Sequence, residues 1–170
     1  MKLETWRKDL LEVAIDVASS FPVDPHVKNR SRAQERVVEA CLELGQPVRA
    51  LAYVTKIVDW RRGAALAELA DYCAARGASA EAERYLGMAR EVAEGDEEGF
   101  KQEWRRDRIR AKIARALYRL GKDDEAATFS ANLSASEVDI VEAALAAHLS
   151  EEDLGQRIEA LDASLQGMVN

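Results

Sequence analysis

The sequence contains little of what several large classes of protein require. Its 170 residues include only two cysteines, Cys41 and Cys73, which are too few for a disulfide scaffold and do not form a Cys-x-x-Cys pair. No apolar run approaches the roughly 20 residues that a membrane-spanning helix needs. Residues 1–13 are charged throughout and lack the apolar centre of a signal peptide. We therefore expect a soluble, cytoplasmic protein without a membrane partner.

Prolines and aromatic residues are also scarce. There are three prolines, and aromatic residues make up 6% of the chain, whereas 48% is hydrophobic and 32% is charged. Abundant Ala, Leu, Glu and Arg favour an all-α fold, and the length suits a single domain with a sizeable core. The net charge of −7 argues against general affinity for nucleic acid, which requires a basic surface.

Residues 63–94 show the pattern around which the rest of the chain is organised. Leu66, Leu69 and Cys73 recur at helical spacing and form one apolar stripe. Gly77 follows, and a glycine can adopt the left-handed conformation that ends a helix. A second stripe then begins, so the stretch is predicted to form two antiparallel helices joined by a short turn. Such a pair cannot bury its apolar faces alone and needs neighbours.

Similar patterns predict helices along the rest of the chain. The predicted helices cover residues 3–19, 46–58, 100–120, 123–132 and 134–149, together with one that ends at Leu44 and a last one from Ser150. The helix that ends at Leu44 begins after Asp24 or nearer residues 29–31, where Ser31 and Gln34 resemble a capping box. Ser79 is expected to cap the second helix of the central pair. The apolar stripe expected for the first helix comprises Leu3, Trp6, Leu10, Val13 and Val17.

Three glycines mark a repeat in the sequence. Alignment on Gly45, Gly77 and Gly121 puts an alanine five residues later and an aromatic residue eight residues later in each case. The matched residues are Ala50, Ala82 and Ala126, then Tyr53, Tyr85 and Phe129, with Cys41, Cys73 and Leu117 four residues before the glycines. Small residues let paired helices approach closely, and an aromatic side chain fills the wedge between pairs. The sequence therefore predicts stacked helical hairpins.

This pattern resembles the tetratricopeptide repeat (TPR) family, whose unit is a helix–turn–helix. The resemblance covers about residues 31–166, although the family's Trp-x-x-Leu-Gly start and its closing proline are absent. It implies an all-α, right-handed α-solenoid of about eight or nine helices in one domain. The expected parts are an N-terminal helix and turn (1–24), repeats at 25–58, 59–94 and 95–133, the last with an insertion, and a degenerate fourth repeat or cap (134–166).

Basic residues are concentrated in the predicted helix 100–120. Residues 101–122 hold nine of the 24 basic residues and two acidic ones. A row that steps by three and four, and so shares one helix face, comprises Arg105, Arg108, Lys112, Arg115 and Arg119. Such a row in a groove suits a carboxylate, a phosphate or an acidic peptide. The alternative is pairing within the protein, for which Glu68 and Asp71 are candidate partners.

The resemblance also implies a test of one known binding mode. Some TPR domains hold the C-terminal carboxylate of chaperones in a clamp of Lys, Asn and Arg from three successive first helices. Arg108 and Lys112 match the last two basic positions of that clamp. Glu35, Glu39 and Glu68 stand where it needs Lys and Asn, so the resemblance does not extend to this function.

No motif predicts catalysis, a metal site or a cofactor. Cys41 and Cys73 occupy equivalent repeat positions and are expected to be small core residues. His26 and His148 stand outside any zinc-binding pattern, and no phosphate loop or Gly-x-Ser-x-Gly elbow is present. Trp60 and Trp104 are expected to pack at junctions between repeats.

We therefore expect a non-enzymatic scaffold that binds a protein or an acidic peptide on its concave face, without a cofactor. The candidate contact residues are Arg105, Arg108, Lys112, Arg115 and Arg119, with Glu35, Glu39 and Asp71 as an acidic counterpart. The alternative hypothesis is a homo-oligomeric structural element. In that case the apolar stripes of residues 3–21 and 154–165 would pair between chains.

Overall fold

A computed structural model describes residues 4–95, 103–134, 137–138 and 141 of the chain. This described part is all-α: it forms seven helices and contains no strand. The helices are α1 (Thr5–Ser20), α2 (Val27–Glu43), α3 (Pro47–Val54), α4 (Arg61–Ala74), α5 (Ser79–Glu94), α6 (Glu103–Arg119) and α7 (Asp123–Ser130). None of these helices combines the length and the apolar character that a membrane crossing would require.

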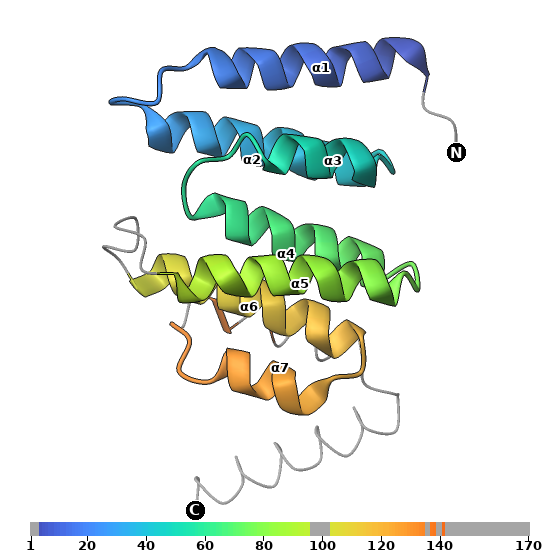
Figure 1. The fold of residues 1–170 in the computed structure, drawn as a ribbon, viewed down its shortest axis with the longest axis vertical. Helices are drawn as coiled ribbons and strands as arrows, with labels where there is room; N and C mark the ends of the chain where they lie inside the picture. The colour runs from blue at the N-terminus through green and yellow to red at the C-terminus, as the bar shows by residue number, and fades with distance from the viewer. Residues whose placement is uncertain (1–3, 96–102, 135–136, 139–140, 142–170) are drawn as a thin grey trace, which may run out of the picture.

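The helices follow one another along the long axis of the molecule, with α1 at one end and α7 toward the other (Figure 1). Three pairs with short connections pack together: α2 with α3, α4 with α5, and α6 with α7. The first helices of these pairs also contact each other, since α4 packs against both α2 and α6. In the view of Figure 1, α3 passes in front of α2 and α5 in front of α6. Helix α4 thus lies between α2 and α6, and α3 and α5 lie in front of these first helices in that view.

The three turns between paired helices have the same conformation. Gly45, Gly77 and Gly121 have φ values of 70°, 73° and 72°, which favour glycine because it has no Cβ. In each turn the residue after the glycine donates its N–H to the carbonyl five residues earlier, at 2.8, 3.0 and 3.0 Å. The glycine N–H bonds to the carbonyl three residues earlier, which completes a Schellman motif. Three equal turns explain why the paired helices repeat.

Small residues allow the helices to approach closely. Ala50, Ala82 and Ala126, which the repeat places five residues after each turn glycine, are all 0% exposed. Gly63 in α4 is a still closer contact, because a Cβ there would lie 2.9 Å from Ile109 Cδ1 and 2.9 Å from Val92 Cγ1. Helices α4, α5 and α6 meet at this point.

The first helix differs from its prediction in the face that it buries. The predicted stripe residues Trp6, Leu10, Val13 and Val17 are between 57% and 59% exposed. The buried residues of α1 are instead Leu11, Ile15 and Ala18. The prediction was wrong because α1 carries apolar residues on two faces, and periodicity alone does not identify the face that meets α2.

One of the two starts predicted for α2 and the cap predicted for α5 are wrong. Ser31 lies inside α2 and is fully buried, because the helix already begins at Val27 after the turn at Pro25. Ser79 is the first helical residue of α5, while Ala78 holds the N-cap position and provides no side-chain bond. The helix starts are set by the connections before them, which in these two places override the local capping signal.

The remaining element predictions agree with the described helices to within a few residues at their ends. The helix predicted at 63 starts two residues earlier, at Arg61. The helices predicted for 134–149 and from Ser150 fall almost entirely outside the described residues, as does most of the segment 95–103.

Candidate functional site

The basic row of α6 faces α4, which supplies two acids to its second half. Lys112 is 4% exposed and forms an ion pair with Glu68. Arg115 also pairs with Glu68 and lies 3.2 Å from Asp71, and Arg119 Nε lies 2.7 Å from Asp71 Oδ1. We call these five residues the α4–α6 ion-pair cluster. Three of the five predicted contact cations are therefore paired within the protein.

The pKa of Glu68 reports how strongly this cluster favours the charged form. Burial by itself would raise the pKa of this carboxyl group. The charges of Lys112 and Arg115, with the hydrogen bonds that both donate, outweigh burial and leave the pKa below its ordinary value. The ion pairs stabilise the contact between α4 and α6. Removal of one charged group would leave its partner buried without a counter-charge, which is unfavourable.

Arg108, nearer the start of the row, borders a pocket instead. A pocket of about 240 Å³ lies between α2, the start of α4 and α6. Its lining comprises Arg32, Glu35, Arg36, Glu39, Trp60, Arg61, Trp104 and Arg108. Arg108 donates no hydrogen bond and forms no ion pair within the described part of the chain. We call this the arginine pocket.

One wall of the arginine pocket is aromatic. The rings of Trp60 and Trp104 meet edge to face, with centroids 5.4 Å apart and an interplanar angle of 81°. Trp60 is 3% exposed, whereas Trp104 is 39% exposed. The guanidinium of Arg61 lies over the Trp60 ring at 4.6 Å, and that of Arg105 lies 5.6 Å from the centre of the Trp104 ring. The predicted packing of both tryptophans at a junction between helix pairs is confirmed.

The floor of the pocket holds buried charge. Arg61 is 5% exposed and lies 2.9 Å from Asp59 Oδ2 and 3.3 Å from Glu35 Oε2. Burial raises the pKa of Glu35, against the opposing charges of Lys112, Arg108 and Arg61. Asp59 also accepts the backbone N–H of Arg61 at 3.0 Å, which fixes the first turn of α4.

Seven of the eight predicted site residues fall into two groups, and the eighth, Arg105, lies beside the Trp104 ring. Arg108, Glu35 and Glu39 line the arginine pocket, where Glu39 accepts a hydrogen bond from Arg36 at 2.8 Å. Lys112, Arg115, Arg119 and Asp71 belong to the α4–α6 ion-pair cluster. Sequence reasoning missed Arg32, Arg36 and Arg61. The spacing of Arg32 and Arg36, one helical turn apart on α2, is the signal that could have found two of them.

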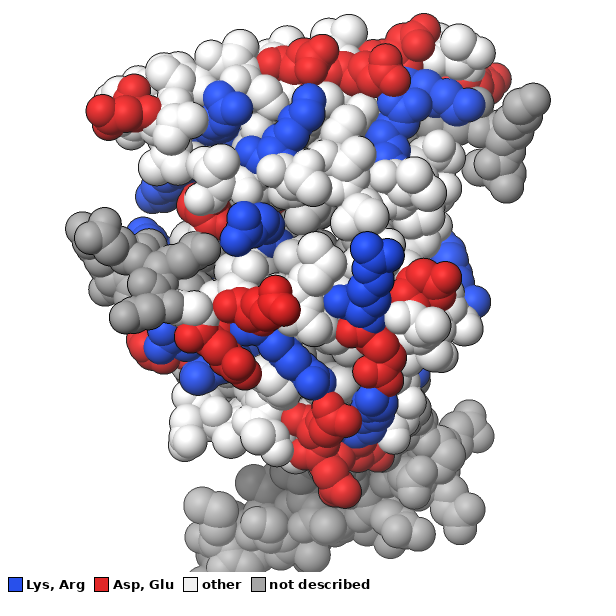
Figure 2. Space-filling model, in the orientation of Figure 1, with Lys and Arg blue, Asp and Glu red and all other residues white. Residues whose placement is uncertain are grey.

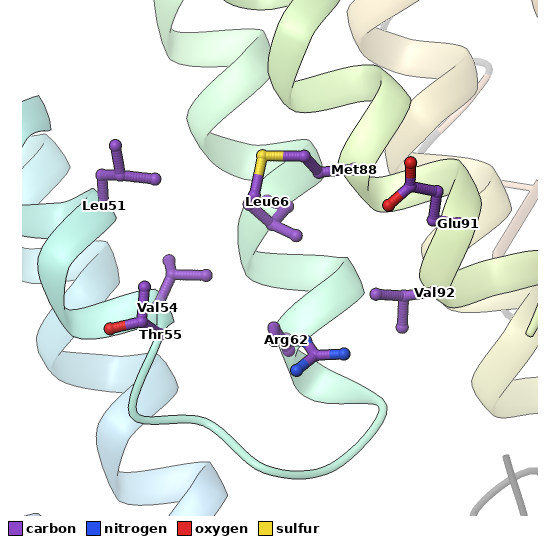
Figure 3. Close-up of a pocket in the computed structure, with 8 residues that line it drawn as sticks. All are labelled: Leu51, Val54, Thr55, Arg62, Leu66, Met88, Glu91 and Val92. Atoms are coloured by element: carbon purple, nitrogen blue, oxygen red, sulfur yellow. The ribbon is translucent and has the colours of Figure 1, made fainter.

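A second pocket lies on the other side of α4, between α3 and α5 (Figure 3). It measures about 310 Å³ and is lined mainly by aliphatic side chains. Leu51 and Val54 come from α3, Leu66 from α4, and Met88 and Val92 from α5. None of the residues predicted for the site lies in this lining.

The outer helices carry mixed charges. Figure 2 shows Lys and Arg next to Asp and Glu over much of the described surface on this side. Ion pairs between different helices include Arg49 of α3 with Glu12 of α1 and Arg90 of α5 with Glu125 of α7, the latter at 2.7 Å. These exposed pairs contribute little stability individually.

The cysteines lie in the core, as predicted. Cys41 is 0% exposed and Cys73 is 7% exposed, and burial raises the pKa of both thiols. Within residues 4–95, 103–134, 137–138 and 141, no cluster of His, Cys, Asp and Glu could hold a metal ion.

The lining of the arginine pocket carries more cations than acids. Its four guanidinium groups outnumber its two carboxylates, and guanidinium binds a carboxylate through two parallel hydrogen bonds.

No protein-family model matches the chain, and neither a curated protein nor a solved structure matches it.

Proposed function

We propose that the chain is a non-enzymatic binding module that takes an acidic segment of a partner protein in the arginine pocket. The observation that carries this proposal is Arg108, which lines the pocket and has no ion-pair partner among the described residues. An acidic side chain would supply that partner. The proposal assigns the remaining cations of the row, Lys112, Arg115 and Arg119, a structural role.

The rest of the pocket suits a peptide. Arg32 and Arg36 are exposed at its α2 side, and 39% of Trp104 is accessible. A peptide could place a carboxylate on Arg108 and an apolar part of its chain against the tryptophan ring. A volume of about 240 Å³ holds one side chain with its adjoining backbone, so the pocket would be one subsite within a longer contact.

We further propose that the helices form a TPR-like right-handed α-solenoid, with α2, α4 and α6 along its concave side. The equal turns at Gly45, Gly77 and Gly121 and the contacts of α4 with α2 and α6 support this arrangement. Solenoids present extended concave surfaces to peptides, so the arginine pocket would stand within a groove.

A titration with a defined peptide tests the function. The probe is a fluorescent ten-residue peptide of alternating Glu and Ala, with a Gln–Ala peptide as its neutral counterpart. We expect only the acidic peptide to bind, and we expect Arg108→Glu to weaken binding at least about tenfold through loss of the charge-assisted contact. Fluorescence anisotropy gives the dissociation constants.

The matched control is Arg84→Glu, which makes the same charge change at an exposed position of α5. It should leave the dissociation constant within about twofold. Equal losses for the two variants would mean that only net charge matters, and would contradict the assignment of the pocket. Failure of the acidic peptide to bind the wild type would contradict the function itself.

A further inference from the structure

Helix α1 has a second apolar face that the described residues leave exposed. Its inner face, with Leu11 and Ile15, packs into the core. The outer face and the turn after it carry six large apolar side chains, each between 43% and 59% exposed: Trp6, Leu10, Val13, Val17, Phe21 and Val23. We call Trp6, Leu10, Val13 and Val17 the α1 stripe. Their spacing of four, three and four residues places them on one side of the helix.

Single exposed apolar residues are common on protein surfaces, but a continuous row of them is not. Val48 on α3 and Val58 before α4 are exposed singly. The α1 stripe instead extends over three helical turns and offers anchors at the positions that one helix uses to pack against another. The outer helices α3, α5 and α7 each pack against the helix that precedes them. The α1 stripe has the form of a helix-packing face on which no described helix packs.

We propose that the α1 stripe docks an amphipathic helix of a partner protein that carries Lys or Arg along one edge. The charge comes from the rim of the stripe. Asp9 stands one turn from Trp6 and Val13, and Asp16 stands one turn beyond Val13 on the same edge. Asp9 forms no ion pair with any described residue, and Asp16 lies 3.6 Å from Lys56 with both side chains exposed.

The opposite edge of the stripe does not favour a charged residue on the partner. Arg7 lies there, and it is already paired with Glu4 at 3.4 Å and placed 5.1 Å from the centre of the Trp6 ring. The Trp6 indole N–H also donates to Glu4 at 3.0 Å. A partner helix therefore gains from basic residues on the Asp9 edge and needs no charge on the other.

The same rim disfavours an antiparallel second copy of α1 and offers a parallel copy no ion pair. Antiparallel pairing of two stripes sets like edges together, so that Asp9 and Asp16 would face their own copies. Parallel pairing sets these two acids beside Ala14 and Phe21, which carry no charge. Residues 150–166 of this chain are a poor occupant as well, because their sequence holds five acidic residues and one basic residue.

Two synthetic helices test the proposal on the full chain. Both are 18 residues long with Leu at heptad positions a and d, and they carry either Lys or Glu along one edge and Ala along the other. We expect the Lys peptide to bind at least about tenfold more tightly than the Glu peptide. Val13→Asp, which places a charge in the middle of the stripe, should weaken binding of the Lys peptide at least about tenfold. Asp9→Lys should reduce or reverse the preference between the two peptides.

Val48→Asp is the matched control, since Val48 is 83% exposed and lies off the stripe. It should bind the Lys peptide like the wild type, and circular dichroism should show Val13→Asp fully folded because the side chain faces solvent. Equal binding of both peptides, or no effect of Val13→Asp, would overturn the proposal. A concentration-dependent dimer in light scattering that Val13→Asp abolishes would assign the stripe to a second copy instead. Arg108→Glu should leave this binding unchanged, so the result is separate from the test of the arginine pocket.

Discussion

Arg108 and Lys112 stand four residues apart on the same face of α6, yet they differ in ion pairing and in exposure. Lys112 is 4% exposed and paired with Glu68, whereas Arg108 lines an open pocket without an ion-pair partner among the described residues. The difference comes from α4, whose acids are Glu68 and Asp71, both in its second half. The periodicity of charge identifies a row, but the neighbouring helix decides which of its members remain available to a partner.

The largest effect should follow from removal of the shared acid. Glu68→Ala leaves Lys112 buried without its counter-charge and removes one of the two acids that pair with Arg115. We expect a loss of about 2–4 kcal/mol in the free energy of unfolding, measured by urea denaturation. Such a loss would establish the second half of the row as structural.

Glu83→Ala is the control for that measurement. It removes the exposed pair that Glu83 makes with Lys122 and should cost less than about 0.5 kcal/mol. Equal effects of the two substitutions would contradict the distinction between a buried cluster and a surface pair.

Gly63→Ala is expected to lower the free energy of unfolding by less than Glu68→Ala does. The added Cβ would lie 2.9 Å from Ile109 Cδ1 and from Val92 Cγ1, and α6 would have to move away from α4 next to the arginine pocket. We expect a cost of about 1–3 kcal/mol from overpacking and weaker binding of the acidic peptide. Gly87→Ala, in open space on α5, should instead stabilise the protein by about 0.5–1 kcal/mol. A stabilised Gly63→Ala variant would show that the spacing of α4 and α6 is not set there.

The smallest effect is a difference in pH dependence between the two acids. The pKa of Glu68 is lowered, so its stabilising contribution is complete above the ordinary value of 4.5 and is lost as the pH falls through the lower folded-state value. The pKa of Glu35 is raised, so protonation of Glu35 favours the folded state as the pH falls through a value above 4.5. The stability lost in Glu68→Gln should therefore shrink below pH 4.5. The free energy of unfolding of the wild type, relative to that of Glu35→Gln, should rise as the pH falls from neutrality towards 4.5. Urea denaturation at a series of pH values measures both differences.

Local signals in the sequence account for much of the fold. The turn glycines Gly45, Gly77 and Gly121 were predicted correctly because a positive φ is a local requirement that few residues meet. The buried face of α1 could not be predicted, since two apolar faces compete and only the position of α2 separates them. For α2 the sequence left two starts open, and the one after Asp24 is the correct one, because the capping pattern at Ser31 lies inside the helix that begins at Val27.

The candidate site was predictable only in part. The charged row on α6 and its two candidate acids could be identified from spacing. That the acids reach Lys112 and Arg119 but not Arg108 depends on the register of α4 against α6, which no local pattern contains. The contribution of Trp104 to the pocket depends on the same register.

The alkylation rates of the two buried thiols can report how often the helices separate. Alkylating reagents attack the thiolate, and burial raises the pKa of the Cys41 thiol to about 11. Modification must therefore wait until a helix separates from its neighbours. Cys41 stands near the end of α2 and Cys73 near the end of α4, four residues before their turn glycines. Their separate alkylation rates would time the opening of two successive hairpins in the same molecule, without any introduced label.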